Sequence, residues 1–88
     1  MGRAEASMNT WRKHPSVTTG GKPYFYRLFD QAGDWQASVI WNRSVRAYAV
    51  EVVTLLVNRV RTGKLLTYAG TVQAGKRQAE QYLRQVQS

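Results

Sequence analysis

The chain has 88 residues, which is enough for one domain with a single modest core. It contains no Cys, which excludes a disulfide framework and Cys-based zinc sites and fits a reducing, cytoplasmic compartment. Thirteen Lys and Arg stand against five Asp and Glu, a formal net charge of +8, and this excess indicates a polyanionic partner such as nucleic acid.

Residues 1–21 are predicted to form a flexible basic arm that precedes an α+β domain over 22–88. The arm begins with "MGRAEASMNTWRKHPS", which has no apolar run, and "TTGGKP" at 18–23 is typical of a turn. His14 is predicted to be a solvated side chain within the arm. No run of residues approaches the ~20 apolar residues that a membrane-spanning helix needs, so no membrane partner is expected.

An antiparallel β-hairpin is predicted from "YFYRLFD" at 24–30 and "WQASVIW" at 35–41. Both stretches alternate, and "DQAGD" between them supplies turn residues. The first stretch alternates in part and places Phe25, Arg27 and Phe29 on one face. The second alternates cleanly and places Trp35, Ala37, Val39 and Trp41 on one face. The two tryptophans are expected on the core side, under helices.

The stretch "SVRAYAVEVVTLLVNRVRTG" at 44–63 fits a helix or a pair of strands. In a helix, apolar residues at spacings of three and four cover one side, and Asn42 or Ser44 caps the start. Six valines weaken that helix by some tenths of a kcal/mol each relative to Ala. The helix is preferred. The alternative, residues 45–61 as strands, gives a β-rich sheet with a C-terminal helix.

The end of the chain contains the plainest helix pattern. "KLLTYAG" at 64–70 predicts a short strand, and "TVQAGKRQAEQYLRQV" at 71–86 predicts a helix capped by Thr71. Gly75 lies on its apolar stripe and is expected to permit close approach to another element. The predicted fold is therefore α+β with the order β-β-α-β-α, a three-stranded sheet packed against two helices.

The sequence lacks the pairs of titratable residues and the metal-binding clusters that catalysis usually needs. His14 is the only histidine, and the acids have ordinary explanations in turns and on polar helix faces. No spacing of glycines fits a nucleotide-binding loop, and no cluster fits a metal. The protein is therefore predicted to be no enzyme and to have no catalytic residues, cofactor, metal site or small-molecule substrate.

The basic and aromatic residues support a small nucleic-acid-binding protein, DNA or RNA, that contacts phosphates from its helices and hairpin. The predicted phosphate contacts are Arg27, Arg43, Arg46, Lys76, Arg77 and Arg84. The residues predicted to stack on bases or to form a partner patch are Tyr24, Tyr26 and Trp35. The alternative is a protein-protein interaction module or homodimer that acts through exposed aromatic and aliphatic side chains. It would be a small inhibitor, adaptor or subunit, of phage or mobile-element type.

The stretch "YAGTVQAGKRQAEQYL" at 68–83 slightly resembles the last strand and helix of double-stranded-RNA-binding domains. The resemblance implies a phosphate-facing lysine at Lys76. It covers under a quarter of the chain, and Val72 and Gln73 replace the other lysines of that motif. The chain is therefore not assigned to the family.

Overall fold

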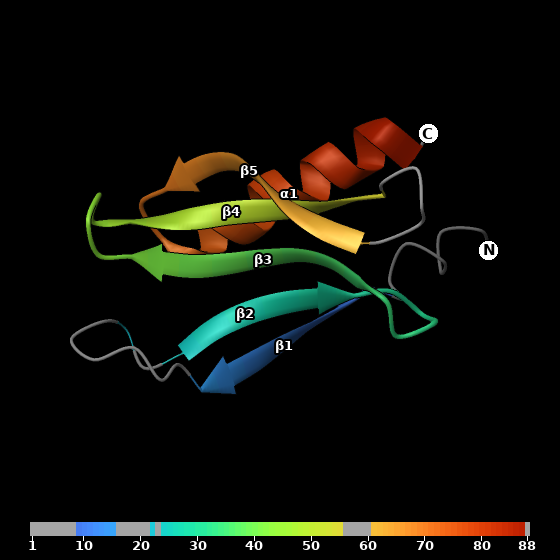
Figure 1. Cartoon of the computed structure of the whole chain (residues 1–88), viewed down its shortest axis with the longest axis horizontal. Coiled ribbons are helices and arrows are strands. Elements are labelled where there is room, and N and C mark those ends of the chain that lie inside the picture. Colours follow the sequence, from blue (N-terminus) through green and yellow to red (C-terminus); the bar gives the residue numbers. More distant parts are fainter. Residues whose placement is uncertain (1–8, 16–21, 23, 56–60, 88) are drawn as a thin grey trace.

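The computed structural model describes residues 9–15, 22, 24–55 and 61–87 (Figure 1). Its elements, in chain order, are β1 (Thr10–Pro15), β2 (Tyr24–Phe29), β3 (Trp35–Asn42), β4 (Ala47–Leu55), β5 (Arg61–Ala69) and α1 (Val72–Gln87). The strands form one antiparallel sheet in the order β1-β2-β3-β4-β5, so each pairs with its sequence neighbour. The helix α1 lies behind the sheet in Figure 1, against β3, β4 and β5.

The predicted order β-β-α-β-α is wrong, because the described part of the chain forms a five-stranded sheet with one helix instead of three strands with two. Ala47–Leu55, expected within a helix, is β4, and Val50 and Val52 in it are buried at 0% and 1% exposure. β-Branched side chains pack well on a pleated surface, which favours the strand here. The alternative of strands is closer to the structure, although residues 56–60 lie outside the described part.

The turn between β3 and β4 explains why Asn42 was wrongly predicted to cap a helix. The Asn42 side chain accepts hydrogen bonds from the backbone N–H groups of Ser44 and Val45, at 2.9 and 3.4 Å. The same side-chain-to-backbone bonding that caps helices also closes tight turns. Asn42 therefore ends a strand instead of beginning a helix.

Residues 10–15, which fall within the expected arm, form the edge strand β1. It pairs with β2 from Thr10↔Phe29 to Pro15↔Tyr24. His14 is half-buried there, stacked on Phe25, and is not the solvated residue that the sequence predicted. Residues 1–8 and 16–21 of the expected arm lie outside the described residues.

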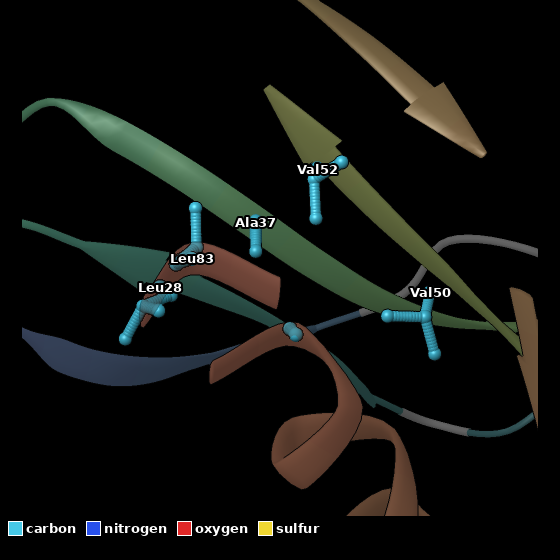
Figure 2. Packing of buried hydrophobic residues seen from close by; sticks show 6 residues of the cluster. Leu28, Ala37, Val50, Val52 and Leu83 are labelled. Carbon is cyan, nitrogen blue, oxygen red and sulfur yellow. The ribbon is translucent and has the colours of Figure 1, made fainter. Parts of the chain in front are cut away.

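The core lies between the sheet and α1 (Figure 2). Its buried cluster is Leu28, Ala37, Val50, Val52, Ala79 and Leu83. The helix is confirmed, and Thr71 Oγ1 accepts the backbone N–H of Ala74 at 3.1 Å as its cap. Gly75 is also confirmed as a point of close approach, since a Cβ there would lie 3.0 Å from a methyl carbon of Val39.

The β2–β3 hairpin is confirmed, but a bulge changes which way Trp35 faces. Leu28 pairs with Ala37, whereas Phe29 pairs with Trp35, so Gln36 is an extra residue on β3. An extra residue breaks the alternation of side chains between the two faces of a strand. Trp35 therefore shares a face with Phe29, away from α1, and the expectation that it lies under a helix is wrong.

Candidate nucleic-acid interface

The face of the sheet opposite α1, named the open face, is turned toward the viewer in Figure 1. Paired residues of an antiparallel sheet project to the same side. One row crosses all five strands on this face: Arg12, Arg27, Ser38, Glu51 and Leu65. In the described part of the chain, no helix or further strand covers the open face. In this row Arg12 and Leu65 are exposed, Arg27 and Glu51 are half-buried, and Ser38 is buried.

Four planar side chains follow one another across β1, β2 and β3 on the open face. His14 stacks on Phe25 with 5.2 Å between ring centroids, and Arg27 lies 5.3 Å from the Phe25 ring. The same guanidinium lies 5.0 Å from the Trp35 ring. This series, named the ring ladder, is His14, Phe25, Arg27 and Trp35. All four side chains are half-buried, so each keeps part of its surface in solvent.

Two features hold Trp35 at the end of the ring ladder: the hydrogen bonds of its indole, and the space that Gly63 leaves beside its ring. Its indole N–H donates to Ser38 Oγ at 2.8 Å and to the Ala37 carbonyl at 3.1 Å. The far edge of the indole reaches Gly63 on β5, where a Cβ would lie 3.1 Å from the Trp35 ring. A glycine at this position therefore makes room for the indole to lie across the sheet.

The two arginines of the open face, Arg12 and Arg27, lie against aromatic rings. Arg12 lies 5.0 Å from the Phe29 ring, which is next to the ring ladder. Arg27 Nε is buried without a hydrogen-bond partner in the described residues. Glu51 is the acid of the same row, but β3 separates its strand from that of Arg27. Cation–π contacts attract a cation without neutralising it, so the charge stays available to an anion.

On the α1 side of the β1–β2 ribbon, three lysines lie over aromatic rings: Lys13 from β1, Lys76 from α1 and Lys22 from the segment before β2. Lys13 lies 4.5 Å from the Tyr24 ring, and Lys76 lies 4.7 Å from the Tyr26 ring and 5.6 Å from the Trp11 ring. Lys22 lies 4.9 Å from the Trp41 ring. We name these three lysines the lysine edge. The ribbon therefore carries positive charge on both faces.

A hydrogen bond links β1 to α1 beside Lys76. The Trp11 indole N–H donates to Glu80 Oε2 at 2.7 Å, between β1 and α1. Glu80 lies one helical turn from Lys76, so both side chains project toward the β1–β2 ribbon. This carboxylate accepts from an indole and forms no described ion pair with the lysines.

The other acids of the hairpin region have structural roles. Asp30 Oδ1 accepts the backbone N–H groups of Ala32 and Asp34 at 2.9 Å each, which shapes the β2–β3 turn. Asp34 forms an ion pair with Arg61 at 3.3 Å. Among the described residues, no group of three or more His, Cys, Asp or Glu is placed to hold a metal ion, and no helix has the length and apolarity to cross a membrane.

The residues predicted for the interface fall into separate groups. Arg27 and Trp35 meet on the open face, whereas Tyr24, Tyr26 and Lys76 lie on the side of α1. Arg43 and Arg46 lie in the β3–β4 turn. Arg77 and Arg84 are exposed on the outward face of α1. The structure thus brings Arg27 together with Trp35 on one face of the sheet and Lys76 together with Tyr26 on the other, and it leaves the turn and outward-helix arginines apart from both pairs.

Other residues of the interface were absent from the prediction: Arg12, Lys13, His14, Lys22, Phe25 and Phe29. The first three were missed because residues 1–21 were expected to be an arm. The sequence contains no clear signal for this strand, because Trp11 is the only large apolar residue of "TWRKHP" and the stretch does not alternate between apolar and polar residues.

No family model, curated protein or solved structure matches the chain. The resemblance of residues 68–83 to double-stranded-RNA-binding domains therefore gains no support from a family match. The chemistry of this interface has to be inferred from the side chains themselves.

Proposed function

We propose that the protein binds nucleic acid, without catalysing a reaction, through cations held over aromatic rings around β1 and β2. One observation carries the proposal. Five basic side chains lie 4.5 to 5.6 Å from aromatic rings, and none of them forms an ion pair with a described carboxylate: Arg12, Lys13, Lys22, Arg27 and Lys76.

This arrangement suits a polyanion for two physical reasons. The rings restrict long side chains that would otherwise lose conformational entropy on binding, so less affinity is lost. None of the five basic side chains forms an ion pair with a described carboxylate, so they can neutralise phosphates and release the cations condensed on the nucleic acid, which favours binding. A net charge of +8 on 88 residues adds attraction at longer range.

A protein partner is the second candidate, and it rests on a different part of the open face. Leu65 and Tyr68 on β5 are 46% and 44% exposed. Both project from the open face, since Leu65 pairs with Glu51 and Tyr68 pairs with Ala49. Large apolar side chains this exposed are typical of a contact surface when they adjoin one another.

A salt titration tests nucleic-acid binding. The affinity for a labelled 20-nucleotide strand and for the matching duplex is measured by fluorescence anisotropy at several salt concentrations. In the double variant Lys13→Gln with Lys76→Gln, the slope of log Kd against log salt concentration should decrease by about 0.7 to 0.9 for each lost phosphate contact. The matched control is Arg77→Gln with Arg84→Gln, which removes equal charge from the outward face of α1.

The outcomes separate the candidates. A smaller salt slope in the lysine variant than in the control supports the proposal. An absence of binding at low salt, or equal slopes in both variants, rejects it. A protein that stays in a purified complex after nuclease treatment, and is released by Leu65→Ser, would favour the second candidate.

A further inference from the structure

We infer that the nucleic acid is single-stranded, and that unpaired bases stack at the ring ladder of the open face. The inference rests on the proposed function and names its ligand class. It follows from the width of the sheet, the chemistry of the ladder and the distribution of charge around the β1–β2 ribbon.

The five strands together are too wide for the open face to enter a duplex groove as a whole. Neighbouring strands lie about 4.8 Å apart, so five strands span about 19 Å between the outer two. The major groove of B-DNA is about 12 Å wide and admits a helix or a two-stranded ribbon. The ring ladder continues to β3, the central strand, and a duplex lying on the sheet would present phosphates to it instead of bases.

The ladder offers planar surfaces of the kind that unpaired bases use. Bases stack on aromatic rings and on arginine guanidinium planes, and such stacking tolerates any base. The ring ladder joins both kinds, with Arg27 between Phe25 and Trp35. Arg27 also places a positive charge beside the rings, where the phosphates that join stacked bases would pass.

The two charged sides of the β1–β2 ribbon also favour a flexible ligand. The molecule measures 21 Å along its shortest axis, and the arginines and the lysine edge lie on opposite faces of the sheet at one border. Double-stranded DNA has a persistence length of about 150 base pairs, so bending it around such an edge is energetically costly. A single strand can pass over β1 and contact both sides.

The experiment compares three ligands and two matched variants. Anisotropy at low salt measures the affinity for a 12-nucleotide oligothymidine, a 12-nucleotide oligouridine and a 12-base-pair duplex; this length lies within the about 4 to 16 nucleotides typical of single-strand sites. We expect at least one single strand to bind at least about tenfold more tightly than the duplex. Phe25→Leu should weaken that binding about 5- to 150-fold, as expected for one lost stacking contact, and change duplex binding less than about twofold.

The control variant is Tyr68→Leu, an exposed aromatic on the same face but on β5. It should change single-strand affinity less than about twofold. If Phe25→Leu does not fold, as judged by far-ultraviolet circular dichroism, His14→Leu replaces it, because His14 is a planar member of the ladder on the edge strand β1.

The outcomes distinguish this inference from the proposed function. Duplex binding as tight as single-strand binding overturns the inference and leaves nucleic-acid binding standing. No binding to any of the three ligands rejects both. An equal loss in Phe25→Leu and Tyr68→Leu overturns the assignment of the ring ladder.

Discussion

The contact of Gly75 with the sheet predicts that Gly75→Ala destabilises the protein. In an exposed helix, the same substitution would stabilise it by about 1 kcal/mol, because Ala has the higher helix propensity. At Gly75, an added Cβ would lie 3.0 and 3.3 Å from the two methyl carbons of Val39 and 3.3 Å from a methyl carbon of Val50. Carbon atoms prefer separations of about 3.5 to 4.0 Å.

The expected magnitude follows from the burial of the two valines. Val39 and Val50 are both 0% exposed, so neither has free space to move into, and overpacking of this kind costs about 1 to 3 kcal/mol. Subtracting the gain in helix propensity leaves a net loss of about 0 to 2 kcal/mol. Removing the Val39 methyl groups with Val39→Ala should relieve most of the clash, so that Gly75→Ala becomes neutral or stabilising in that background.

Urea unfolding, followed by circular dichroism, measures the free energy of unfolding of the wild type, both single variants and the double variant. The expected coupling energy is about 1 to 3 kcal/mol. Gln81→Gly compared with Gln81→Ala, at an exposed position of α1, calibrates helix propensity in this protein. If Gly75→Ala is stabilising by about 1 kcal/mol and shows no coupling to Val39→Ala, the argument from close packing is refuted.

The remaining predictions concern the β3–β4 turn and the link between β1 and α1. Arg46 has a φ of 54°, in the left-handed region that costs a non-glycine residue about 1 to 2 kcal/mol. Arg46→Gly should therefore leave the free energy of unfolding, measured by urea unfolding, unchanged or raise it by up to about 1 kcal/mol. A loss of stability would contradict this. Trp11→Phe removes the donor to Glu80, and a half-buried bond to a charged group predicts a loss of about 1 kcal/mol, measured as a lower Tm. An unchanged Tm would mean that water replaces the indole without cost.

The sequence predicts those parts of the fold that are held by local signals. Alternation and turn residues located β2 and β3, and the apolar stripe with Thr71 located α1. The helix prediction for residues 45–61 failed because their apolar residues fit both the helical and the strand period. Strand pairing on both sides of β4 favours the strand. A helix preference was overridden by tertiary contacts that no single segment encodes.

The candidate site was only partly predictable, for related reasons. The alternation of the first hairpin strand correctly placed Arg27 with Phe25 and Phe29, but β1 was not recognised, so its contribution was lost. A single extra residue, Gln36, turned Trp35 to the other face. Bulges of one residue leave little trace in a sequence, because the strand on either side still alternates.

The order of the strands bears on how the chain reaches this structure. Every strand pairs with the one before it, so the sheet can grow by adding one hairpin at a time and never has to bring distant segments together first. Closing short loops loses little entropy, and chains dominated by sequence-local pairing reach their native state faster than those with crossed β topologies. The docking of α1 needs β3, β4 and β5 in place, and the outermost strand, β1, is then joined to the helix through the bond from Trp11 to Glu80.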